Sequence, residues 1–136
     1  MKEQSTPYFA PQLYIKGDVT DISFYEKAFD AVVLRKFLND DGTIHVAELT
    51  INGAMFHIHE EKLSTGRINP QHANGNTALV GFFVADVDSM VASAVEAGAT
   101  VVTPAQSYDY GYRQAEIKDP FGHILLIEAK FDGSAT

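Results

Sequence analysis

Two histidines and a glutamate in the first half of the chain are spaced for acid–base or metal chemistry. The Asn52-Gly53 dipeptide supplies the positive φ angles that a two-residue hairpin turn requires. Counting back from such a turn places Glu48 opposite His57, with His59 on the same face two residues further along. A carboxylate beside an imidazole favours its charged form, so the pair could act as an oriented general base or as two metal ligands. A cross-strand polar pair that only satisfies itself is the alternative.

Similar side chains recur in the second half of the chain. Glu116 repeats Glu48 at an offset of 68 residues, and Glu128 repeats His59 one residue later in register. Gln114 faces Glu128 if the turn between their strands preserves the register. Otherwise Glu128 lies at an exposed strand end, so this second polar face depends on the turn.

Three tyrosines close together could contribute an aromatic surface. Tyr108, Tyr110 and Tyr112 alternate with Asp109 and Gly111. Rings in this arrangement fit a rim around a planar or cationic ligand. The high strand propensity of tyrosine explains the same pattern without any ligand.

The side chains predicted to bind a ligand are those that alternate toward one side of the expected strands. They are Gln12, Tyr14, Glu48, His57, His59, Phe83, Tyr110, Tyr112, Glu116 and Glu128. The sequence assigns a catalytic role to none of them.

These side chains need a scaffold of strands, and both halves of the chain predict the same one. Asp18 and Asp86 each open a stretch of apolar residues at helical spacing, and each aspartate could cap the helix that follows. We expect helices over residues 18–29 and 86–97, each preceded by one strand and followed by three. The chain is therefore a duplication of one βαβββ module.

The duplication predicts a single α+β domain over residues 8–130. Its expected parts are module one at 8–60, a linker at 61–76 and module two at 77–130. A chain of 136 residues is long enough to bury one core of this kind.

Composition argues against several classes of partner. The formal net charge of −8 opposes a nucleic-acid or anionic-membrane surface, which needs clustered lysine and arginine. The chain has no cysteine, so disulfides and thiolate metal sites are excluded. No apolar run reaches the roughly 18 residues of a membrane span. Residues 1–7 lack the apolar core of a signal peptide, so we expect a cytoplasmic location.

Three segments resemble the vicinal-oxygen-chelate superfamily, which includes glyoxalase I, extradiol dioxygenases, fosfomycin-resistance enzymes and bleomycin-binding proteins. They are the helix signature Phe24–Phe29, the final hairpin Asp119–His123, and Ala47–Ala54, which is closest to the PhnB-like branch. The resemblance implies two βαβββ modules that form a curled mixed-sheet cup with the helices outside. It also implies a homodimer, because modules from two chains often complete one cavity in this superfamily.

Members that use a metal place one ligand on the first and last strand of each module. By this resemblance the places fall near Ala10, His57, Leu79 and Leu126. A register shift of two residues gives Gln12, His59, Gly81 and Glu128 instead. The first set contains one possible ligand, and the second contains a single histidine among three. We therefore predict that the protein holds no metal and no other cofactor.

Two functions from different classes follow. The first is a metal-free protein that holds a small organic or antibiotic-like molecule in the cup, favoured by the missing metal ligands, the acidic charge and the tyrosines. The second is a divalent-metal-dependent lyase or dioxygenase, in which the ion would polarise substrate oxygens as a Lewis acid. The expected partners are the small-molecule ligand and a second copy of the chain, with no nucleic acid and no membrane.

Overall fold

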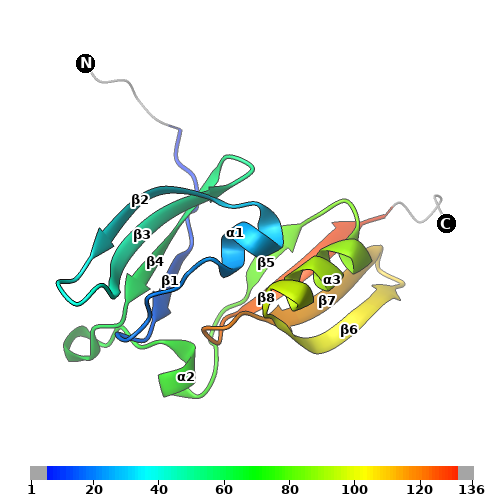
Figure 1. Ribbon diagram of the computed structural model, residues 1–136. Coiled ribbons are helices and arrows are strands. Elements are labelled where there is room, and N and C mark those ends of the chain that lie inside the picture. The colour runs from blue at the N-terminus through cyan, green and yellow to red at the C-terminus, as the bar shows by residue number, and fades with distance from the viewer. Residues whose placement is uncertain (1–5, 132–136) are drawn as a thin grey trace.

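Two four-stranded mixed sheets make up the α+β fold of this chain (Figure 1). The computed structural model describes residues 6–131. The first half contains β1 (Gln12–Ile15), α1 (Phe24–Phe29), β2 (Val32–Leu38), β3 (Ile44–Ile51) and β4 (Ala54–Glu60). The second half contains β5 (Val80–Phe83), α3 (Val87–Ala97), β6 (Thr100–Tyr108), β7 (Tyr112–Lys118) and β8 (Ile124–Lys130). A 3-10 turn, η1 (Leu63–Thr65), and a short helix, α2 (Pro70–Ala73), lie in the connection.

Both sheets have the same topology. In sheet one, β1 pairs in parallel with β4, and β3 and β2 follow antiparallel. In sheet two, β5, β8, β7 and β6 repeat that order and those directions. The predicted fold class with two βαβββ units is thereby confirmed. The boundaries predicted for the domain, its linker and its modules stay predictions.

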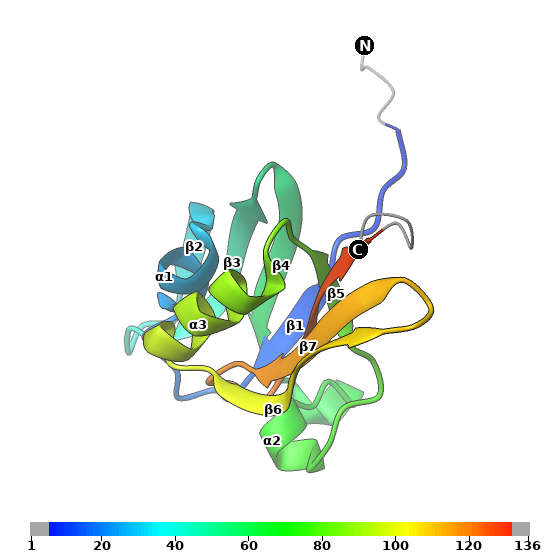
Figure 2. The ribbon, with the colours of Figure 1, turned by 90° about the vertical axis from the view of Figure 1, so that its right-hand side faces the viewer.

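The helices α1 and α3 pack against each other and lie on one side of the two sheets (Figure 2). Strand residues alternate between this covered side and the opposite side. Leu49 and Ile58 of sheet one, with Ile117 and Ile127 of sheet two, are fully buried on the covered side. We call the opposite side of each sheet its open face.

The hairpin between β3 and β4 has the predicted two-residue turn. Asn52 and Gly53 have φ angles of 50° and 83°. The strands pair so that Glu48 opposes His57, and His59 lies on the same face two pairs further on. Strand alternation therefore sends all three side chains to the open face, which confirms the predicted register.

The first helix is shorter than predicted. It begins at Phe24, and Asp18 caps no helix. The preceding residues make other bonds: the Asp21 carboxylate accepts the Ser23 amide at 2.8 Å, and the Val19 carbonyl accepts the amide of Ile44 at 2.9 Å. Because the Val19 carbonyl accepts a hydrogen bond from the first residue of β3, residues 19–22 are irregular and do not extend the helix.

The second helix agrees with the prediction. The Asp86 side chain accepts the amide of Ser89 at 3.1 Å and so caps α3. Gly98 ends the helix at a φ angle of 126°. No helix among residues 6–131 is long and apolar enough to cross a membrane.

A buried hydrogen-bond network joins the two halves of the chain. Tyr25 on α1 donates to Asp119 Oδ2 at 2.5 Å, and His123 Nδ1 bonds to the same oxygen at 3.1 Å. Burial and the neighbouring Asp119 raise the pKa of Tyr25 well above its ordinary value. Asp119 thus fastens α1 to the turn between β7 and β8, and the final hairpin has a structural role here.

The two sheets are not joined to each other. Among the described strands, β1 pairs only with β4 and β5 only with β8, so one edge of each stays unpaired. The eight strands therefore do not form one continuous sheet. The cup implied by the resemblance consists here of two separate, unclosed sheets.

Candidate functional site

Gln12 joins the two histidines on the open face of sheet one. Its Oε1 accepts from His57 Nδ1 at 3.1 Å and from His59 Nε2 at 2.6 Å, because an amide oxygen cannot donate. Its own Nε2 donates to the Ala10 carbonyl at 3.3 Å, which fixes the amide orientation. His57 Nε2 then faces the Met55 sulfur at 3.3 Å and keeps its lone pair when the ring is neutral.

Glu48 is bound by Arg35 rather than by His57. The guanidinium donates from Nε to Oε1 at 3.0 Å and from Nη2 to Oε2 at 2.9 Å. His57 Nε2 lies 3.9 Å from Glu48 Oε2, which is too far for a hydrogen bond. The bonds from Arg35 hold the pKa of Glu48 below its ordinary value. The two predicted neighbours are adjacent, but the carboxylate does not orient the imidazole, and Gln12 does so instead.

Arg35 is the functional-site residue that sequence reasoning missed. An uninterrupted count from the Leu38–Ile44 pair would set Arg35 opposite Ala47, on the covered side of the sheet. A bulge between Phe37 and Leu38 shifts the register by one residue, so Arg35 opposes Glu48. Arg35 and Glu48 are visible in the sequence as opposite charges on adjacent strands, but the bulge is not.

The pKa of His59 is lower than that of an ordinary histidine. Burial lowers its pKa most, and the nearby His57, His45 and Arg67 lower it further. Tyr14 stacks on its ring, with centroids 5.1 Å apart and an angle of 22° between the planes. The predicted side chains Gln12, Tyr14, His57 and His59 are thus in mutual contact, and we call them the polar cluster.

Glu128 is a buried carboxylate on the open face of sheet two. Only 6% of the residue is exposed, so the predicted alternative of an exposed strand end is wrong. Gln114 Nε2 donates to Oε1 at 2.8 Å, and Tyr110 OH donates to Gln114 Oε1 at 2.7 Å. The other carboxylate oxygen lies beside Gly81, where an added Cβ would be 3.1 Å away. Within the described residues Glu128 forms no ion pair.

A row of four aromatic rings lies next to this carboxylate. Phe83 opposes Glu128 in the pairing of β5 with β8. Ring centroids are 6.2 Å apart for Phe83 and Tyr112, 5.8 Å for Tyr112 and Tyr110, and 5.2 Å for Tyr110 and Tyr108. Phe83 and Tyr110 are 58% and 60% exposed. The tyrosines surround the turn between β6 and β7, and we call Phe83, Tyr112, Tyr110 and Tyr108 the aromatic row.

Glu116 occupies the position in sheet two that Glu48 occupies in sheet one. Its Oε1 accepts a hydrogen bond from the Thr103 hydroxyl at 2.9 Å, where Glu48 has an arginine. The two halves therefore keep the cross-strand pair but differ in its charge. Glu116 lies two residues from Gln114 along β7, further from the aromatic rings.

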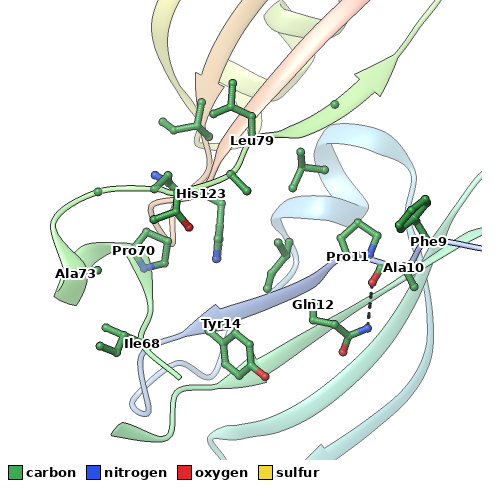
Figure 3. Close-up of a pocket in the computed structure, with 18 of the residues that line it drawn as sticks. Phe9, Ala10, Pro11, Gln12, Tyr14, Ile68, Pro70, Ala73, Leu79 and His123 are labelled. Carbon is green, nitrogen blue, oxygen red and sulfur yellow. Dashed lines mark hydrogen bonds between the residues drawn. The ribbon is translucent and has the colours of Figure 1, made fainter. Parts of the chain in front are cut away.

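A cleft of about 610 Å³ opens between β1, β5 and the connection that joins the halves (Figure 3). Gln12 and Tyr14 line it from sheet one, and Gly81 lines it from sheet two. Its apolar walls include Phe9, Pro11, Ile68 and Leu79. Because Gly81 is also the neighbour of Glu128, the cleft adjoins both the polar cluster and the buried carboxylate.

The side chains implied as metal ligands do not converge. In the part of the chain that the structure describes, no group of three or more His, Asp or Glu could hold a metal ion. Gln12 and His59 belong to sheet one and Glu128 to sheet two, and Gln12 Oε1 already accepts two hydrogen bonds. This donor set does not fit a divalent ion in the present arrangement. That the protein holds no metal stays a prediction.

Comparison with known proteins identifies the family. A sequence model described as the Glyoxalase/Bleomycin resistance protein/Dioxygenase superfamily matches residues 20–127. The chain belongs to this superfamily. The resemblance seen in the helix signature and the final hairpin is thereby confirmed at the level of the superfamily, while the PhnB-like branch stays a prediction.

Individual proteins also match most of the chain. The uncharacterized protein Rv0887c of Mycobacterium tuberculosis is 35% identical over 120 residues, covering 86% of this chain and 71% of that protein. The crystal structure of TioX from Micromonospora sp. ML1 has a TM-score of 0.62 at 25% identity, covering 93% of this chain and 98% of TioX. FosX, a fosfomycin resistance protein of Listeria monocytogenes, has a TM-score of 0.64 at 15% identity, covering 93% and 94% of the chains. FosX therefore shows the common fold alone.

Proposed function

We propose that this superfamily member binds a small organic molecule in the cleft between its two sheets, without a metal. The observation that carries the proposal is the cleft itself. It has a volume of about 610 Å³, and its walls are mostly apolar with few polar groups. Sites for small ligands typically have volumes of about 300–1,000 Å³ and this kind of lining. A ligand there would contact side chains from both halves of the chain.

Each sheet offers the ligand a different kind of contact. From the polar cluster, Gln12 and Tyr14 line the cleft and offer their amide and hydroxyl groups for hydrogen bonds to the ligand. The aromatic row lies outside the cleft but close to it, since Phe83 is two residues from Gly81 on β5, and it offers exposed rings to a planar or apolar part of the ligand that extends beyond the cleft. The metal-dependent lyase or dioxygenase lacks comparable support, because its donor atoms do not converge in the described residues.

The test fills the cleft with a larger side chain. Leu79 lines the cleft and is about half exposed, so Leu79→Trp should occupy the space without disturbing the core. A library of small organic molecules is screened by thermal shift, and the affinity of each compound that binds is measured by calorimetry. We expect Leu79→Trp to weaken binding by on the order of tenfold or more.

Val95→Trp is the matched control, because Val95 is an exposed apolar residue on α3 that does not line the cleft. It should leave the affinities unchanged. Binding that survives Leu79→Trp without any loss would place the ligand elsewhere and refute the proposed site.

Three finer assignments are also proposals. Membership of the PhnB-like branch rests on the segment Ala47–Ala54. A homodimer rests on the unpaired edges of β1 and β5, which favour pairing with another chain. A cytoplasmic location rests on the sequence alone.

A further inference from the structure

We propose that the ligand carries a positively charged organic group, such as a quaternary ammonium, which binds between the Glu128 carboxylate and the aromatic row. This inference rests on the proposed function and specifies its class of ligand. Four features of the described residues support it: a carboxylate without an ion-pair partner, adjacent exposed rings, a glycine beside the carboxylate, and an arginine on sheet one that is already paired.

The carboxylate of Glu128 is only partly satisfied within the chain. Burying a charged group is costly unless it is paired and hydrogen-bonded. Gln114 satisfies Oε1, but Oε2 accepts no hydrogen bond from the described residues. The lysines on this face, Lys118 and Lys130, are exposed at the ends of β7 and β8 and form no ion pair with Glu128. A bound cation would supply the missing charge.

The aromatic row supplies the second half of the recognition. Phe83 is the direct neighbour of Glu128 across β5 and β8, and its ring contacts Tyr112. The faces of such rings attract organic cations, most strongly where water is excluded. A carboxylate flanked by rings discriminates an organic cation from a neutral molecule of the same shape, because only the cation gains from both.

Gly81 makes room for the Glu128 carboxylate, because Oε2 lies close to the position that a Cβ would take. Its φ angle lies outside the left-handed region, so the backbone does not require glycine there. A glycine within a strand often marks a close approach by a ligand or by another chain. A Cβ at this position would lie 3.1 Å from Glu128 Oε2, tighter than an ordinary contact, so alanine would crowd the carboxylate.

The arginine on the open face of sheet one is already paired. Arg35 is engaged by Glu48 through two hydrogen bonds. Burial and neighbouring charges keep the pKa of His59 low, so this imidazole is neutral near neutral pH. The net charge of −8 attracts cations over a longer range.

The experiment compares two molecules of the same shape and different charge. The probes are (4-hydroxyphenyl)trimethylammonium and 4-tert-butylphenol, in which a carbon replaces the charged nitrogen. Both are titrated by calorimetry into the full chain, and contacts are mapped by NMR. We expect the cation to bind on the order of tenfold more tightly than the neutral probe.

Two variants test the residues directly. Glu128→Gln keeps an oxygen to accept from Gln114 and removes the charge, so it should abolish the preference for the cation while changing the neutral probe less than about twofold. Gly81→Ala should weaken binding of the cation, because the added Cβ crowds Oε2 without any change in charge. Glu96→Gln, on α3 behind the sheet, removes one negative charge far from the site and should leave both affinities unchanged.

The outcomes separate this inference from the proposed function. Equal binding of both probes, unaffected by Glu128→Gln, would overturn the cation inference and leave the binding function intact. Failure of both probes, together with an empty ligand screen, would overturn both. A preference that Glu96→Gln reduces as much as Glu128→Gln would show general attraction to an acidic protein and would also refute a specific site.

Discussion

His59 experiences burial and positive neighbours at once, and both disfavour its protonation. Burial lowers its pKa most, followed by His57, His45 and Arg67. A histidine whose pKa is lower in the folded than in the unfolded chain binds protons better when unfolded. It therefore favours folding above its ordinary pKa of 6.5, and this contribution is lost as the pH falls through the lower, folded-state value.

We predict that the Cε1 proton of His59 titrates in the folded protein with a midpoint below 6.5, as followed by NMR. On acidification through this range, the free energy of unfolding of His59→Gln should fall less than that of the unchanged protein. A midpoint at or above 6.5 would mean that the carbonyl oxygen of Gln12 stabilises the charged ring more than burial destabilises it.

Single residues of the site were predictable where strand alternation alone decides their direction. His57 and His59 lie on one face because a two-residue turn fixes the register of β3 and β4, and Gln12 joins them because β1 pairs in parallel with β4. Side-chain partners were less predictable. The pairing of Arg35 with Glu48 depends on a bulge, and the burial of Glu128 depends on neighbours from two other strands.

At the scale of elements, the β3–β4 turn fixes the register that brings Glu48 beside His57. Gly53 has a φ angle of 83°, where a side chain is strained. We predict that Gly53→Ala lowers the free energy of unfolding by about 1 kcal/mol, measured by urea denaturation. Gly75→Ala is the control, because Gly75 has no positive φ and no atom lies within 4 Å of an added Cβ. The free energy of unfolding of this variant should hardly change.

The link between α1 and the β7–β8 turn is a second test at this scale. Tyr25→Phe removes the donor to Asp119 Oδ2 and leaves a buried carboxylate with one fewer hydrogen bond. We predict a loss of about 1–3 kcal/mol in the free energy of unfolding. Tyr8→Phe removes the same atom from an exposed residue and should be neutral. A neutral Tyr25→Phe would show that apolar packing alone holds α1 in place.

The elements themselves were largely predictable from periodicity and turn residues. The capped helix α3 occurs as expected, since an N-cap aspartate acts locally. The start of α1 was not predictable, because the Val19 carbonyl accepts a hydrogen bond from the Ile44 amide of β3. A tertiary bond of this kind competes with helix capping and leaves no mark in the local sequence.

At the scale of the whole molecule, the unpaired edges of β1 and β5 favour self-association. Exposed apolar residues accompany them, among them Phe9 and Leu79 at the cleft. We predict a homodimer at micromolar concentration, measured by sedimentation velocity. Leu79→Lys, which places a charge at this surface, should shift the equilibrium toward monomer, whereas Val95→Lys on α3 should not. A monomer at all accessible concentrations would refute the prediction.

The second whole-molecule prediction concerns metal. The possible ligands are divided between the two sheets and do not converge in the described residues. We predict less than stoichiometric zinc, nickel or iron in the purified protein by elemental analysis, with no change in thermal stability on adding chelator. A stoichiometric metal lost in both His59→Ala and Glu128→Gln would show that the two sheets come together in solution to build a shared site.

The difference between the two open faces has a consequence for how a guest molecule is oriented. A duplicated chain with identical halves would accept an asymmetric guest in two equivalent, reversed poses. Here one half carries imidazoles and an arginine–glutamate pair, and the other carries two carboxylates without a basic partner and a row of aromatic rings. Divergence of the two halves thus makes the two poses inequivalent, so that the site favours one orientation of the guest. We expect a spin-labelled cationic probe to broaden NMR signals at one end only, and equal broadening at both ends would show that the poses still exchange.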